Sequence, residues 1–197
     1  HLVRQAGYVE RPARVGAILE AVSKLELFGT VPVKHFGENF IRAVHDGDFV
    51  SYLKAVCRKL EGSRPVYPYV FPIRRPEKRP KDLALRAGYY CIDTFTPLDR
   101  NAYQAARSAV DVALTAAEEV LAGRRVAFAL CRPPGHHAGK RTFGGFCYFN
   151  NAAIAAPPEP DGPGGGAGHR LPPRERDAGY LLRPFRCSHR LHPRAPQ

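Results

Sequence analysis

The composition of the chain changes sharply near residue 157, and this change limits which part can fold. Residues 157–197 hold 9 of the 19 prolines and 6 of the 18 glycines in only 41 positions. They also hold 7 arginines, no lysine and 4 acidic residues. Because proline and glycine interrupt helices and strands, this mixture favours irregular structure. We therefore expect residues 1–156 to fold and residues 157–197 to form an irregular tail.

The chain as a whole is apolar enough to build a core, since 44% of its residues are hydrophobic. No apolar run approaches the roughly 20 residues of a membrane span, and no segment resembles a secretory leader. The 5 cysteines are widely spaced, so they predict neither a disulfide framework nor a Cys-x-x-Cys metal site. A reducing cytoplasm is therefore the expected location. The first residue is His1 rather than methionine, which favours a processed product or a fragment.

The formal net charge of +12 suggests a nucleic-acid-binding protein. The tail accounts for +3 of it, from 7 arginines minus 4 acids. The densest cationic cluster is Arg74, Arg75, Lys78, Arg79 and Lys81. Glu77 and Asp82 interrupt that cluster, and such runs are commonly solvated loops. Nucleic acid is thus not the expected partner, although a basic nucleic-acid-binding protein stays an alternative.

Apolar spacing predicts four helices. The first begins at Pro12 and carries Val15, Ile18, Leu19 and Val22. The second is N-capped by Asp48 and turns Phe49, Leu53, Val56, Cys57 and Leu60 inward. The third runs over 101–121 with Ala105, Ala109, Val112, Ala116 and Val120 inward and Gly123 as its C-cap. The fourth covers 151–156.

The continuously apolar segment VAFALC, residues 126–131, is typical of a strand buried on both faces. A helix, a buried strand and another helix in succession predict an α/β fold with a parallel sheet flanked by helices. Residues 61–87 are rich in proline and charge and are interpreted as a long surface loop, expected near a substrate entrance.

The chemistry is concentrated in the loop after the expected strand. Its segment 129–156 reads ALCRPPGHHAGKRTFGGFCYFNNAAIAA. His136 and His137 are adjacent, and imidazole moves protons near neutral pH. Neighbouring side chains of an extended segment point apart, so only an unusual loop would bring both imidazoles to one centre. Phe146, next to Gly145, offers an aromatic wall beside closely approaching backbone.

The string RPPGHHA…GGFCYFNNAAIAA resembles the signature of the zinc-dependent deacetylase superfamily, which includes histone deacetylases and acetylpolyamine amidohydrolases. Upstream, YVERPARVGAILEAV and AVHDGDFVSYLKAV resemble helical segments of that family. The segment RAGYYCIDTFTPLDRNAYQAARSAVDVALTAAEEVL is similar to the acetylpolyamine amidohydrolase branch. The resemblance covers about residues 7 to 156 and implies the N-terminal part of an arginase/deacetylase-like domain, incomplete in this chain.

The resemblance implies hydrolysis of an acetamide, in acetyl-lysine proteins or in small acetylpolyamines. In such enzymes Zn²⁺ polarises the carbonyl and lowers the pKa of a bound water to about 7. His137 matches the general base and acid, and His136 matches its electrostatic partner. Gly145 and Phe146 match the wall of the acyl tunnel, and Asp93 matches a substrate-holding aspartate at the rim. For the acetylpolyamine branch, the resemblance also implies a homodimer.

The family's zinc ligands follow this signature in a DxDxHHGxGT motif, which the chain lacks as written, so we expect no metal ligand in it. Codons permitted for residues 167–183, read one nucleotide later, yield LDIDYHHGSGTQDIFYA. Most first and second codon positions are dictated by the amino acids, so chance recovery of the motif is a poor explanation. We therefore expect the tail to be translated out of frame, and the chain as written to be poorly stable, to bind no catalytic zinc and to be inactive. A catalytically dead, partner-binding relative stays an alternative.

Overall fold

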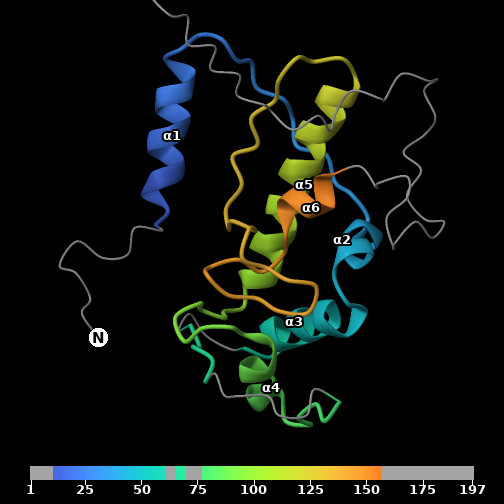
Figure 1. Cartoon of the computed structure of the whole chain (residues 1–197). Helices are drawn as coiled ribbons and strands as arrows, with labels where there is room; N and C mark the ends of the chain where they lie inside the picture. The colour runs from blue at the N-terminus through green and yellow to red at the C-terminus, as the bar shows by residue number, and fades with distance from the viewer. Residues whose placement is uncertain (1–10, 61–64, 70–76, 157–197) are drawn as a thin grey trace, which may run out of the picture. The chain divides into compact units, whose positions relative to one another are not determined.

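The computed structural model describes residues 11–60, 65–69 and 77–156, all of which belong to one compact unit. The expected tail, residues 157–197, and two members of the cationic cluster, Arg74 and Arg75, lie outside the described residues. The described helices, drawn in Figure 1, are α1 (Ala13–Ser23), α2 (Glu38–Val44), α3 (Gly47–Lys59), α4 (Leu83–Tyr90), α5 (Ala102–Leu121) and α6 (Asn151–Ala155). Helix α6 packs on α5 and α2, while α3 packs on α2, α4 and α5. No helix in the described part is long and apolar enough to cross a membrane.

Helix α1 begins where the sequence predicts, with Pro12 at its N-cap. Its apolar positions are poorly covered, since none of its residues is buried and Leu19 is exposed. The prediction of a helix here is confirmed, whereas the stripe of apolar side chains along it contributes nothing to the core.

Helix α3 forms as predicted, but its N-cap is Asp46 rather than Asp48. The carboxylate of Asp46 accepts a hydrogen bond from the backbone N–H of Asp48 at 3.0 Å, which satisfies a free amide of the first turn. Asp48 instead lies in that turn, where its carboxylate pairs with Arg79. The predicted apolar side of the helix is confirmed, since Phe49, Leu53, Val56 and Cys57 are buried, with Leu60 at the C-cap only partly so.

Helix α5 matches the predicted range, but the face expected to point inward was wrong. Of the expected inward residues only Ala109 is buried, and Ala105 is exposed. The buried face instead includes the polar residues Asp111 and Thr115. The side chain of Asp111 binds the backbone N–H of Phe36, at 3.1 Å, and that of Thr115 binds the N–H of Lys34, at 3.0 Å. A polarity pattern assigns such residues to the solvent side, although here they bind the backbone of residues 34–36.

The end of α5 and the start of α6 agree with the sequence. The glycine signal after α5 is confirmed, since Gly123 has φ +101° and follows the C-cap Ala122. Helix α6 starts at Asn151, one residue after the N-cap Asn150, whose side chain accepts from the N–H of Ala153 at 3.1 Å. It ends one residue earlier than predicted.

The buried strand expected over 126–131 is not present. These residues form no strand, and Val126 and Phe128 are 63% and 58% exposed. The described residues form isolated bridges only, such as the antiparallel pair Val66 and Leu98, so no neighbouring strand is available for a ladder. The apolar side chains of this segment, which a sheet would cover on both faces, are therefore exposed, as expected for a segment without neighbouring strands.

The loop expected over 61–87 ends earlier than predicted, because α4 begins at Leu83. Ala87 is buried with 4% exposure, so this part belongs to the core rather than to a surface loop. Residues 61–64 and 70–76 of that loop lie outside the described residues.

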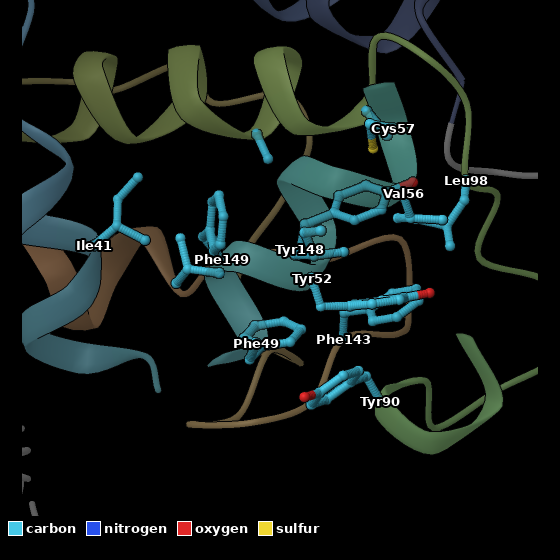
Figure 2. Close-up of a cluster of buried hydrophobic side chains, with 14 of the residues drawn as sticks. Ile41, Phe49, Tyr52, Val56, Cys57, Tyr90, Leu98, Phe143, Tyr148 and Phe149 are labelled. Atoms are coloured by element: carbon cyan, nitrogen blue, oxygen red, sulfur yellow. The ribbon is translucent and has the colours of Figure 1, made fainter. Parts of the chain in front are cut away.

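The core is aromatic and joins α3, α4 and the segment before α6. Figure 2 shows Phe49 of α3 beside Tyr90 and Phe149. The ring centroid of Phe49 lies 5.5 Å from that of Tyr90, 6.4 Å from that of Phe143 and 6.3 Å from that of Phe149. These separations are typical of packed aromatic pairs. Since Phe143 and Phe149 follow the two histidines in sequence, the core fixes the chain at two points after the histidines.

Candidate functional site

A tight turn brings the two neighbouring histidines together. The N–H of Ala138 donates to the carbonyl of Gly135 at 3.0 Å, which closes a turn around His136 and His137. Their ring centroids lie 4.3 Å apart, at an interplanar angle of 55°. Both side chains are exposed. The two imidazoles therefore share one place on the surface, which an extended segment would not allow.

Gly145 lies directly under the imidazole of His137. A Cβ added to Gly145 would approach Cδ2 of His137 to 2.4 Å, closer than side chains tolerate. Gly145 also has φ +57°, in the left-handed region that favours glycine. Glycine is thus required here for two reasons: the positive φ of the turn, and the close approach of the His137 imidazole. Phe146 follows with φ +62°, which is uncommon for a residue with a bulky side chain.

Asp93 holds this left-handed turn in place. Its Oδ2 accepts from the N–H of Gly145 at 2.5 Å and from Oγ1 of Thr96 at 2.8 Å. Its Oδ1 accepts from the N–H groups of Phe95 and Thr96, at 2.9 and 2.7 Å. Thr96 in turn accepts from the N–H of Phe146 at 3.0 Å. Two successive amides of the strained turn are thus bound by one carboxylate and one hydroxyl.

The environment of Asp93 favours its charged form. Burial opposes ionisation, but the hydrogen bonds from Gly145, Phe95 and Thr96 outweigh it, so the pKa of the Asp93 carboxyl is below its usual range. All of these donors belong to the chain itself. A carboxylate held in this way positions the Gly145–Phe146 turn. The ring of Phe146 packs against that of Phe95, with centroids 5.5 Å apart.

The segment that carries the histidines closes on itself. Gly135 is buried, and a Cβ there would approach the carbonyl oxygen of Phe149 and the amide nitrogen of Asn151 to 2.5 Å each. The side-chain amide of Asn151 donates to the carbonyl of Pro133 at 3.2 Å. Only glycine permits this close approach of two backbones. Residues 133–135, before the histidines, therefore pack directly against residues 149–151 at the start of α6.

The middle of the segment is tied to α4. The N–H of Phe143 donates to the carbonyl of Tyr90, and the N–H of Ile92 donates to the carbonyl of Phe143, both at 2.9 Å. Phe143 itself is fully buried. These bonds place Asp93, two residues after Cys91, directly beside Gly145. The site therefore depends on α4, which the sequence did not predict.

A buried histidine that sequence reasoning missed supports the loop from below. His45, 1% exposed, follows α2. Its Nδ1 lies 2.9 Å from the carbonyl oxygen of Gly139, and its Nε2 accepts from the N–H of Asn150 at 2.9 Å. Since a carbonyl only accepts, Nδ1 carries the proton and the ring is neutral. The partners lie 94 and 105 residues away in sequence, so no local pattern marks this role.

His45 should make the protein less stable as the pH falls from about 7 towards 5. Burial is the main reason that the pKa of the His45 imidazole is below the ordinary 6.5, although the carbonyls of Gly139 and Lys140 oppose that shift. Below pH 6.5 the unfolded chain therefore binds a proton at His45 more readily than the folded chain does. The stabilisation from the neutral, buried His45 is complete above pH 6.5 and decreases below it. Urea unfolding followed by circular dichroism at several pH values measures the effect.

Two observations assign that pH window to His45. Carboxylates affect stability at a lower pH than this window. The pKa of Glu38, which is bound by Lys54 and Tyr103, is about 2, and free carboxyls titrate near 4. His45→Gln removes the titrating group and should flatten the profile between pH 7 and 5. A wild-type profile that is already flat there would contradict the prediction.

Within residues 11–60, 65–69 and 77–156, no three His, Cys, Asp or Glu side chains gather where they could hold a metal ion. The residues of this part do not fit a zinc site, and the chemistry that they can supply comes from their own side chains. These side chains provide a pair of exposed imidazoles, next to a rigid turn that carries an aromatic ring.

Comparison with known proteins identifies the family to which most of the chain belongs. The model of the histone deacetylase domain matches residues 8–158, which is most of the chain. The chain belongs to the histone deacetylase domain family. The match ends where the composition changes, and the histidine pair, Gly145, Phe146 and Asp93 all lie inside it.

Relatives in this family are acetylpolyamine amidohydrolases. Acetylpolyamine amidohydrolase 1 of Pseudomonas aeruginosa is 40% identical over 152 residues, which cover 74% of this chain and 44% of that protein. The enzyme of Mycoplana ramosa is 36% identical over 151 residues, with coverages of 75% and 44%. The chain thus spans less than half the length of these relatives.

A solved member of the family has a similar fold. The crystal structure of acetylpolyamine aminohydrolase from Burkholderia pseudomallei superposes with a TM-score of 0.68 at 34% identity, covering 76% of this chain and 44% of that one. The described residues therefore follow the deacetylase fold. The parallel sheet expected from the sequence stays a prediction, because the described residues contain no strand.

Proposed function

We propose that this chain is the N-terminal part of a zinc-dependent deacetylase that hydrolyses the acetamide of an acetylpolyamine or an acetyl-lysine side chain. The observation that carries the proposal is the pair His136 and His137, with rings 4.3 Å apart. The pair lies on a turn closed by Gly135 and Ala138, and His137 contacts the left-handed turn at Gly145 and Phe146. In this proposal the pair moves the protons of the reaction.

The roles differ between the two imidazoles. His137 takes a proton from the attacking water and later returns it to the leaving amine, because it lies over Gly145 beside the Phe146 turn. His136 acts as the electrostatic partner of His137. Phe146 forms one wall for the acyl group. Asp93 holds the Gly145–Phe146 turn, and a contact from its carboxylate to substrate is a further part of the proposal.

The metal ligands are proposed to be encoded in the shifted reading frame of residues 157–197. Two observations support this proposal. The family match ends at residue 158, and the shifted text contains the ligand pattern DIDYHHGSGT. The chain as written, which lacks that pattern, is proposed to be inactive and to bind no catalytic zinc.

The test is to sequence the source DNA and restore the reading frame after residue 156. The frame-restored protein should bind zinc stoichiometrically and hydrolyse acetylated polyamines or acetyl-lysine peptides, and the ratio of the two rates identifies the substrate class. The chain as written, purified in parallel, is the matched control and should do neither. Stoichiometric zinc and deacetylase activity in that control, or codons that cannot encode the ligand pattern, would overturn the proposal.

A further inference from the structure

A cavity of about 320 Å³ lies between α3 and α5 and is lined largely by cationic side chains. Its lining includes Lys54, Arg58, Arg100 and Arg107, together with Tyr103 and Gln104. Among the described residues, no acidic side chain lines it. None of these residues belongs to the segment that carries His136 and His137, so the cavity is separate from the candidate site.

Helix geometry explains why these cations face one hollow. Lys54 and Arg58 are four residues apart on α3, and Tyr103 and Arg107 are four residues apart on α5, so each pair shares one face of its helix. Arg100 lies just before α5. Helices α3 and α5 pack against each other, which brings the two cationic faces together.

The charges of the cavity are only partly neutralised. Lys54 pairs with Glu38 at 2.8 Å, but Glu38 also pairs with Arg42 at 2.6 Å. Arg107 donates to the backbone carbonyl of Phe36 at 2.6 Å, which is a neutral partner. Within the part of the chain that the structure describes, Arg58, Arg100 and Arg107 form no ion pair with an acidic side chain. The three guanidinium groups are thus without a directly paired carboxylate, although the charge of Asp99 reaches Cys57 in the lining, where it helps to raise the pKa of the thiol after the larger effect of burial.

The side chains at the inner end of the cavity are held in place by contacts with neighbouring residues. Tyr103 donates its hydroxyl proton to Glu38 at 2.7 Å, and the ammonium of Lys54 lies 5.8 Å from the centroid of the Tyr103 ring. These contacts hold Lys54 at the wall of the cavity. Arg107 is fixed by its bond to the backbone before α2. The cavity is therefore built from held groups at its inner end and from the exposed Arg58 and Arg100 at its rim.

We propose that this cavity binds a small anion with two adjacent phosphate groups. Guanidinium groups match phosphate oxygens in pairs, which makes arginine the preferred residue for such ligands. One phosphate group carries a charge of about −1.5 to −2 at neutral pH, so two are needed to balance three arginines. The volume lies at the lower end of the range for small-molecule sites, which suits a pyrophosphate-sized ligand. This proposal does not depend on the proposed deacetylase function.

The probe is inorganic pyrophosphate, titrated into the full chain by calorimetry at fixed ionic strength. One pyrophosphate per chain should bind, and the affinity should decrease as salt is added, because the contacts are electrostatic. In Arg58→Gln/Arg100→Gln the affinity should fall at least about 10-fold, since each charge-assisted bond to phosphate is among the strong ones. Both side chains are exposed, so the variant should keep the circular dichroism spectrum of the wild type.

The matched control is Arg11→Gln/Arg125→Gln, which removes the same charge from two exposed arginines outside the cavity. It should bind pyrophosphate as the wild type does. Equal losses in both double variants, or no binding to the wild type, would overturn the proposal. Sulfate that binds as tightly as pyrophosphate would also overturn it, as would a single-stranded oligonucleotide that binds more tightly and depends on Arg58 and Arg100.

Discussion

Replacing His137 with glutamine in the frame-restored protein should lower kcat by about 10²–10⁴-fold, which is the usual contribution of a positioned acid–base group. Glutamine preserves size and polarity but cannot exchange a proton near neutral pH. The free energy of unfolding should stay the same, because the imidazole of His137 is exposed. Steady-state kinetics together with urea unfolding separate these two effects.

The matched control for this prediction is His35→Gln. His35 is also an exposed histidine, with a side chain 87% accessible, and it contacts Asp111 at 3.0 Å on α5 rather than the candidate site. Glutamine can still donate a hydrogen bond to that carboxylate, so activity should change little. Full activity in His137→Gln, or equal losses in both variants, would rule out an acid–base role for His137.

Truncating Phe49 to alanine should strongly lower the urea midpoint of the chain. Phe49 is fully buried and contacts the rings of Tyr90, Phe143 and Phe149. Such substitutions cost about 3–5 kcal/mol, which is a large part of the roughly 5–15 kcal/mol that stabilises an ordinary domain. Because the chain contains no tryptophan, circular dichroism during urea titration is the suitable measurement.

Phe128→Ala is the control for the core truncation. It removes the same side chain at a position that is 58% exposed, so the urea midpoint should change little. A variant at Phe49 that unfolds at the wild-type midpoint would show that the aromatic core around α3 does not hold the molecule together. A large loss at Phe128 would show that the segment 126–131 is covered in solution.

The helices could be predicted wherever local spacing and caps decide the structure. Helices α1, α3, α5 and α6 follow their apolar or small-residue patterns and the signals at Pro12 and Gly123. Helices α2 and α4 were missed, being only 7 and 8 residues long and stabilised mainly by packing. The inward face of α5 was wrong because Asp111 and Thr115 are buried with backbone partners that lie far away in sequence.

The candidate site could be predicted only as far as the resemblance reached. The signature predicted His136, His137, Gly145 and Phe146 as site residues, the wider resemblance added Asp93, and the structure brings these five residues together through contacts that no spacing reveals. Thr96 and His45 were missed since each acts on backbone groups about 50 to 105 residues away. Neither residue stands in a pattern that would distinguish it from an ordinary buried polar side chain.

The closure of the segment at Gly135 has a consequence for hydrogen exchange. Backbone amides of this segment are bound internally, with Gly144 and Cys147 bonded to each other at 2.9 Å and Asn150 bonded to His45. A surface loop normally exchanges these protons quickly through small local openings. Here an opening that frees the amide of Asn150 must also break its bond to the buried imidazole of His45. Deuterium uptake at the Asn150 amide therefore reports the loss of a contact with the buried core, and it provides an internal probe of folding next to the candidate site.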